Sequence, residues 1–257
     1  GLWAVAAMAL WIAALIWNWD VGGSYGGPYW HAHEMLFGYS SAALAGFLLT
    51  AVPNWTGRLP VSGTPLVVLF AVWCAGRLVL LAPDLLGLLP SILIDAAFLP
   101  LLLAICAREI IAGRKWKDLK ILAGILALAI ANIGFHLFIA WGGDTGLANR
   151  LGVGAFVMLI SVMGGRVVPS FTRNWLVKRQ VSALPVPYNA FDTVTLLTGL
   201  VALGLWVALP GTVWAASACL LAGILHLARL RRWRGWRTWD EKLVLVLHVG
   251  YAFVPLG

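Results

Sequence analysis

The chain has 257 residues, of which 61% are hydrophobic and only 11% are charged. Its mean hydropathy is +0.90, whereas an ordinary soluble domain is roughly 25% charged. The composition therefore excludes a soluble globular domain and predicts a chain that uses lipid as its solvent.

Apolar stretches of roughly 20 residues are long enough to cross a bilayer as helices. They lie at 2–19, 31–53, 64–82, 88–107, 119–141, 150–169, 190–209, 211–230 and 241–257. We therefore predict an all-α, polytopic transmembrane helix bundle with about nine spans, in which residues 1–257 form a single helical domain. Because the chain starts at Gly1 and stops within an apolar run, we expect it to be truncated at both ends.

The formal net charge of +8 would be compatible with nucleic-acid binding, but the basic residues gather in every second connection. Those connections lie around Arg58 and at 108–120, 173–179 and 229–242. The intervening connections at 20–30, 83–87 and 142–149 contain no Lys or Arg. By the positive-inside rule the basic connections are cytoplasmic, and the first residues lie on that side. We interpret the basic segment 229–237 as a contact with lipid headgroups and not as a nucleic-acid site.

The three cysteines, Cys74, Cys106 and Cys219, lie far apart within predicted spans. None belongs to a C-x-x-C pair, which argues against thiol redox chemistry, thiolate zinc and covalent c-type haem. We interpret them as buried, inert thiols.

Ionisable side chains within the spans are the candidates for function, because a charge at the bilayer centre costs roughly 2.5 kcal/mol or more. These candidates are His31, His33, Glu34, Arg77, Asp95, His136, Arg166, His226 and His248. The predicted helix directions place the first six in the outer half of the bilayer, so they could converge on one site. The alternative is a structural ion pair between Arg77 and Asp95, with histidines that only form hydrogen bonds.

The start of the second span permits a prediction about its two histidines. Pro is favoured at the first helical position, so the helix is predicted to begin near Pro28. Residues three apart on a helix share a face, whereas residues two apart point in nearly opposite directions. His31 and Glu34 should then share a face and His33 should point elsewhere. We predict that His31 and His33 do not chelate one ion unless this turn is unwound.

Other polar residues in the spans permit both structural and functional interpretations. Asn132 and His136 are four residues apart, so both should project inward, and the amide could orient the imidazole. His248 could ligate haem iron or form a hydrogen bond to a neighbouring helix. We interpret His226 as an imidazole that snorkels toward the basic loop and Arg166 as a headgroup anchor.

Three segments of the chain resemble the NnrS family. The first is HAHEMLFG at 31–38, which continues as GFLLTAVPNWTG at 46–57. The others are RVVPSFTRN at 166–174 and HVGYAFVPLG at 248–257. They occur in the order that the family has, and the resemblance extends over essentially all of residues 1–257.

The resemblance implies a bacterial inner-membrane protein of about twelve spans that carries haem and copper. It also implies a link to nitric oxide metabolism, denitrification and the response to nitrosative stress. A haem b is implied because the C-x-x-C-H attachment motif is absent. The implied metal ligands are His31, His33, His136 and His248. Arg77 is expected to pair with a haem propionate. Glu34, Asn132 and Asp95 are expected to orient the ligating side chains by hydrogen bonds without binding the metal themselves.

The leading functional hypothesis is a membrane protein that binds or turns over nitric oxide, or a related species, at a His-ligated metal in the outer half of the bilayer. Its expected partners are the lipid bilayer and nitric oxide, and nucleic acid is not among them. The alternatives are a transporter of a metal ion or small anion, and a cytochrome b-like electron carrier. Transporters usually show internal repeats, and we find no clear repeat in this sequence.

Overall fold

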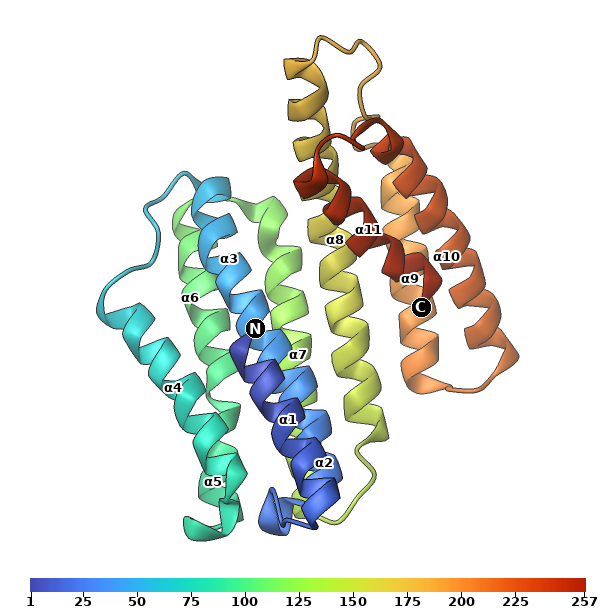
Figure 1. Ribbon diagram of the computed structural model, residues 1–257. Helices are drawn as coiled ribbons and strands as arrows, with labels where there is room; N and C mark the ends of the chain where they lie inside the picture. The colour runs from blue at the N-terminus through green and yellow to red at the C-terminus, as the bar shows by residue number, and fades with distance from the viewer. The chain divides into compact units, whose positions relative to one another are not determined.

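The computed structural model describes residues 1–257 and contains helices but no strands, so the predicted all-α fold is confirmed (Figure 1). Seven helices are long and apolar enough to cross a membrane. Two shorter apolar helices, Leu2–Trp17 and Lys242–Leu256, correspond to the first and last predicted spans. The fold is therefore a polytopic bundle of membrane helices.

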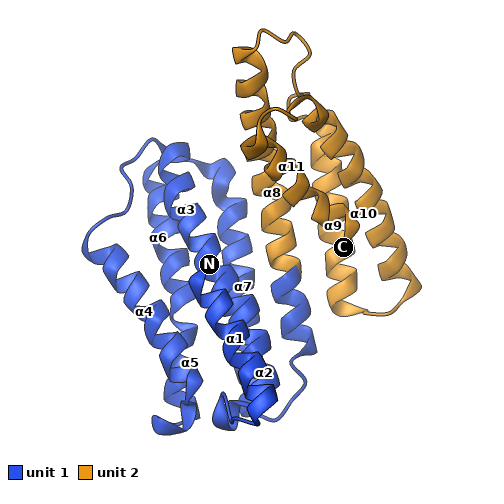
Figure 2. Ribbon diagram, viewed as in Figure 1, with its two compact units in different colours: residues 1–153 blue, residues 154–257 orange.

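The chain divides into two compact units, Gly1–Val153 and Gly154–Gly257 (Figure 2). Each unit is built from antiparallel helices that follow one another in the chain. The expectation of a single domain over residues 1–257 stays a prediction.

Unit 1 contains the N-terminal helices, which are joined by short helical turns. Its α-helices are α1 (Leu2–Trp17), α2 (Gly27–His33), α3 (Ser40–Thr56), α4 (Thr64–Leu81), α5 (Leu88–Ala96), α6 (Phe98–Ala112) and α7 (Leu119–Ala140). Its 3-10 turns are η1 (Gly23–Tyr25), η3 (Pro83–Leu85) and η4 (Trp116–Asp118). A π-helical turn, η2 (Glu34–Tyr39), joins α2 to α3 without breaking the span. The helix α8 (Gly146–Lys178) begins in this unit and continues into the next.

The helices of unit 1 bring one end of several spans together. α5 packs against α4 and α7, and η2 packs against α1 and α3. The start of α2, the end of α4, the start of α5 and the end of α7 all lie at the lower end of this unit in Figure 1. Side chains near those ends can therefore meet inside the unit.

Unit 2 contains the remainder of α8 with α9 (Ala190–Ala208), α10 (Val213–Arg232), the turn η5 (Gly235–Arg237) and α11 (Lys242–Leu256). α9 packs against α10, and α11 packs against α10. A capping box fixes the start of α9, where Asn189 accepts a hydrogen bond from the backbone and Asp192 accepts one from the Asn189 N–H group.

Large apolar side chains cover the outer faces of both units, as expected for helices that face lipid. Examples are Val67, Phe70 and Leu78 on α4, each more than 60% exposed. Of the three cysteines, Cys106 is buried, Cys74 is half-buried and Cys219 is exposed. The interpretation of buried thiols is therefore wrong for Cys219, which is exposed although its thiol reaches the Ala202 carbonyl of α9 at 3.9 Å.

Candidate metal centre

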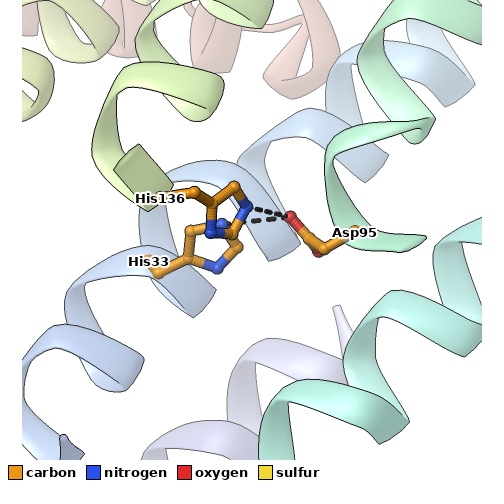
Figure 3. Close-up of side chains that lie close together, drawn as sticks. All are labelled: His33, Asp95 and His136. Carbon is orange, nitrogen blue, oxygen red and sulfur yellow. Dashed lines mark hydrogen bonds and ion pairs between the residues drawn. The ribbon is translucent and has the colours of Figure 1, made fainter. Parts of the chain in front are cut away.

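Two histidines and one carboxylate from three helices of unit 1 form a compact buried group (Figure 3). His33 comes from the end of α2, Asp95 from α5 and His136 from the last turn or so of α7. All three side chains are buried. The nitrogen and oxygen atoms that they offer lie within 4.8 Å of one another, so one metal ion could bind all three. We call these three residues the His–Asp group.

Both imidazoles face the same carboxylate oxygen. His136 Nε2 lies 2.9 Å from Asp95 Oδ2, and His33 Nε2 lies 3.2 Å from it. Ligand atoms around a tetrahedral ion with bonds of about 2.0 Å are about 3.3 Å apart. The two nitrogen–oxygen separations are therefore close to those around a first-row transition metal.

Asn132 links His33 to Asp95. Its Oδ1 atom lies 2.8 Å from His33 Nε2, and its Nδ2 group donates to Asp95 Oδ2 across 3.3 Å. Asn132 and His136 both project inward from α7, and both are buried. The amide contacts the imidazole of His33 and not that of His136, with which it shares a helix face.

A buried ion-pair network adjoins the group. Arg77 on α4 forms an ion pair with Asp95 through Nη2, and its Nη1 atom lies 3.2 Å from Glu34 Oε2. Trp3 donates to the same Glu34 oxygen across 2.6 Å. The structural ion pair and the histidine group, which the sequence left as alternatives, are therefore both present and share Asp95.

Tyr25 reaches the far side of His136 from the turn η1. Its hydroxyl lies 3.0 Å from His136 Nδ1. Because His136 Nε2 faces a carboxylate, which only accepts, Nδ1 is the acceptor and the hydroxyl is the donor. Burial raises the pKa of Tyr25 well above its usual value, and the negative charge of Glu34 adds to this effect. The hydroxyl therefore keeps its proton over the physiological pH range.

Two glycines make room for this network. A Cβ atom at Gly38 would collide with the Arg77 guanidinium and come within 2.6 Å of the Glu34 carboxylate. A Cβ atom at Gly76 would lie 2.7 Å from Asp95 Oδ1. Glycine at these two positions therefore leaves free the space that the ion-paired side chains occupy.

Three buried polar atoms at this site have no hydrogen-bond partner: His33 Nδ1, Glu34 Oε1 and Arg77 Nε. The His33 and Glu34 atoms face each other at 3.6 Å. Buried groups without partners are rare in native proteins, and a ligand, ion or ordered water is a common reason for them.

The two histidines of α2 point in different directions, as their spacing predicts. His31 stacks on Trp11 at a ring separation of 5.1 Å, and Glu34 accepts a hydrogen bond from Trp3, so both contact α1. His33 points elsewhere and meets Asp95 and His136, and the group of possible metal ligands does not include His31. The π-helical turn η2 follows directly after His33, and π-turns commonly occur at functional sites.

The remaining candidate residues lie in unit 2. His248 Nε2 lies 2.8 Å from the hydroxyl of Thr172, and its Nδ1 atom has no partner. His226 is buried and forms a hydrogen bond of 2.8 Å with the Tyr251 hydroxyl, so it does not snorkel to the surface. Arg166 is exposed on α8, as a headgroup anchor would be.

Sequence reasoning missed Tyr25, Trp3 and Gly76. Tyr25 lies in the glycine-rich turn just before the second span. The predicted topology places this turn on the same side of the bilayer as the end of the span that carries His136, and this shared level could have indicated their contact. Trp3 and Gly76 carry no such signal, because their partners become visible only when α1, α4 and α5 are packed together.

The fold and the His–Asp group together define a polytopic helical membrane protein with a buried site suited to a metal ion. A model of the family described as "NnrS protein" matches residues 1–257, and the chain belongs to this family. No curated protein and no solved structure is similar enough to match the chain. Membership of the NnrS family makes the chain a membrane protein related to nitric oxide.

Proposed function

We propose that the chain binds copper at His33, Asp95 and His136 and that this metal binds or turns over nitric oxide or a related species. One observation carries the proposal: two imidazoles and a carboxylate meet in a buried site whose neighbouring polar atoms lack partners. Family membership supplies the link to nitric oxide.

The donor set suits copper. Imidazole is a good ligand for copper, iron, nickel and zinc. Three protein ligands leave at least one coordination position open, and a metal with an open position is a Lewis acid that also binds small diatomic ligands. The group contains no cysteine, so it differs from thiolate copper sites.

A haem fits this group poorly. Its ring would have to lie between the two imidazoles, whose centroids are 4.7 Å apart and whose Nε2 atoms both face Asp95 Oδ2. Such a ring would displace Asp95 from its ion pair with Arg77. We therefore assign the His–Asp group to copper and leave His31 and His248 as the candidate haem ligands, which the resemblance suggests.

The charge of the site supports a bound cation. With both carboxylates ionised, Glu34 and Asp95 face the single guanidinium of Arg77, so the network carries one excess negative charge. An unbalanced charge in a low-dielectric interior is costly. A cation beside Asp95 would balance it, as would a proton on His33, so metal and proton should compete for the site.

The surrounding residues position the ligands. With a metal on Nε2, Nδ1 of His136 would carry the ring proton and donate it to the Tyr25 hydroxyl, which would hold the imidazole in place. Arg77 holds Asp95. Hydrogen bonds of this kind to metal ligands commonly change metal affinity by about 10- to 100-fold. Asn132 contacts Nε2 of His33, the atom that the metal would take, so its amide would have to yield that position.

We also propose that the chain lies in the bacterial inner membrane with its basic connections on the cytoplasmic side. The His–Asp group then lies in the outer half of the bilayer. Nitric oxide is small and apolar enough to reach it through lipid, so no aqueous channel is required.

The test is a metal analysis of the full chain purified in detergent, combined with a visible spectrum before and after addition of nitric oxide. We expect copper in the wild-type chain, its loss in His33→Ala and His136→Ala, and its retention in His31→Ala, the matched control. Haem is measured separately by its Soret band. Copper that stays in both variants, or a colourless chain without metal, would contradict the proposal, and the second result would favour the transporter.

A further inference from the structure

A pocket with an apolar floor and a basic edge lies at one end of the α9–α10 pair in unit 2, remote in sequence from the His–Asp group. Its volume is about 460 Å³. The floor is formed by Val186, Phe191, Ala228 and Trp236. The edge is formed by three arginines, Arg231, Arg232 and Arg234. The combination of an apolar cavity and clustered cations is what an anionic amphiphile requires.

The pocket is a built feature of the fold. The connection before α9 crosses the end of α10, where the backbone N–H group of Val186 donates to the carbonyl of Arg232 across 3.2 Å. The Arg232 guanidinium lies over the ring of Phe191 at 4.5 Å from its centroid. Arg234 adopts a left-handed backbone conformation, with φ at 58°, which turns the chain just after α10. These contacts hold the floor and the edge together.

The basic edge has little compensating negative charge. Asp192 is the nearest carboxylate, and it is already paired with the fully buried Arg229 at 2.9 Å and more loosely with Arg232 at 3.4 Å. Asp240 pairs with Arg179. Neither Arg231 nor Arg234 forms an ion pair in the structure, so both guanidinium groups are available to a ligand.

Favourable interaction with the helix dipole does not account for this arrangement. Cations are favoured in the last turn of a helix, which explains Arg231 and Arg232 at the end of α10. It does not explain Arg234, which lies beyond the helix, or the apolar cavity beside these side chains.

We propose that this pocket binds one anionic phospholipid, with an acyl chain on the apolar floor and the phosphate between Arg231 and Arg234. Guanidinium groups bind phosphate oxygens in a bidentate manner, so two of them define a specific position for the headgroup. Basic pockets between membrane helices are known to bind acidic headgroups. Basic residues in general attract many anionic headgroups at the membrane surface. This pocket would instead hold a single lipid molecule in a defined position.

The test is native mass spectrometry of the full chain in detergent, with phosphatidylglycerol and phosphatidylcholine as the probes. We expect one phosphatidylglycerol to stay bound and phosphatidylcholine to dissociate. Glycerol phosphate, which has the headgroup charge but no acyl chain, should not compete at equal concentration. Competition by glycerol phosphate would identify a site for a free anion and overturn the lipid proposal.

Matched variants separate the pocket from the surface charge. The double variant Arg231→Gln and Arg234→Gln should weaken phosphatidylglycerol binding by about thirtyfold, or about fivefold for each cation. The double variant Arg237→Gln and Lys242→Gln removes the same charge outside the pocket. Its affinity should change by less than threefold at physiological salt, where exposed charges are screened. An equal loss of affinity in the two double variants would overturn the proposal.

A further variant fills the cavity without changing the charge. Ala228→Trp should abolish retention of the lipid, whereas Ala216→Trp, at an exposed position near the other end of α10, should retain it. Circular dichroism of both variants checks that the helices are intact. Lipid retained by a folded Ala228→Trp chain would show that the acyl chain does not use the pocket.

Discussion

The hydroxyl of Tyr25 lies 3.0 Å from Nδ1 of His136, so a residue outside the membrane helices controls which nitrogen of a buried imidazole faces the site. The contact joins the turn η1 to α7, which are far apart in the sequence. His136 Nε2 thereby faces Asp95 at 2.9 Å, in the position of a metal ligand.

Tyr25→Phe should therefore weaken copper binding without removing a ligand. Loss of a hydrogen bond to a ligating histidine reduces metal affinity by about 10- to 100-fold. The measurement is a competition titration of the purified chain against a copper chelator. Tyr29→Phe, at an exposed tyrosine of α2, is the control and should leave the affinity unchanged. An unchanged affinity in Tyr25→Phe would show that His136 is oriented by packing alone.

Asp95→Asn should remove most of the bound copper, because Asp95 contacts both histidines. The loss of stability should stay well below the roughly 3–5 kcal/mol of a broken buried ion pair, because Glu34 remains as the counter-charge of Arg77. The free energy of unfolding is measured by titration with a denaturing detergent, and copper by metal analysis. Asp240→Asn removes a carboxylate that is 79% exposed and should change neither quantity. Normal copper content in Asp95→Asn would show that the carboxylate is not a ligand.

Gly38→Ala should destabilise unit 1, because the new methyl group would collide with Arg77 and Glu34. Overpacking of this kind typically costs about 1–3 kcal/mol. Gly46→Ala is a matched control on the same span, because no atom lies within 4 Å of the position of its Cβ. Detergent unfolding of the two variants should differ by that amount. Equal stability would show that Arg77 can move aside without cost.

The positions of the helices along the chain could be predicted from sequence because they depend on local properties. Each apolar stretch that we predicted as a span is a helix in the structure. The common depth of Arg77, Asp95 and His136 could also be predicted, because helix rise and direction are enough to place a residue along a span. Their convergence depends on which helices pack together, and a single sequence does not contain that information.

The histidine pair shows what helix periodicity predicts and what it leaves open. Because His31 and His33 lie two residues apart in α2, the spacing predicts that they point in different directions. The structure agrees, since His31 stacks on Trp11 and His33 lies beside Asp95 and His136. The spacing does not tell which of the two meets the ligands on other helices, because that depends on tertiary packing.

Acid should loosen the link between η1 and η3. The carboxylate of Asp84 accepts a hydrogen bond of 2.9 Å from the backbone N–H group of Ser24, and hydrogen bonding to Ser24 lowers the pKa of Asp84. A lowered folded-state pKa means that the stabilisation is present above the usual pKa of Asp and is lost as the pH falls through the folded-state value. Hydrogen exchange of the Ser24 amide should accelerate, relative to other amides, below about pH 4. In Asp84→Asn this relative acceleration should be absent, and its persistence would assign the effect to another group.

Arg229 and Asp192 should be more important for the stability of unit 2 than the surrounding basic residues. The Arg229 side chain is fully buried, and it donates to Asp192, to the Ser161 carbonyl and to the Tyr251 hydroxyl. Arg229→Met leaves the Asp192 carboxylate without its closest partner, at a cost of about 3–5 kcal/mol.

The double variant Arg229→Met and Asp192→Asn should recover most of this loss, because the amide has no charge to compensate and can still cap α9. Detergent unfolding measures both, with Arg237→Met as an exposed control that should stay within about 0.5 kcal/mol of the wild-type chain. If the double variant were as unstable as the single one, the hydrogen bonds to Ser161 and Tyr251, and not the ion pair, would be the main contribution of Arg229. The comparison therefore separates charge compensation from hydrogen bonding inside unit 2.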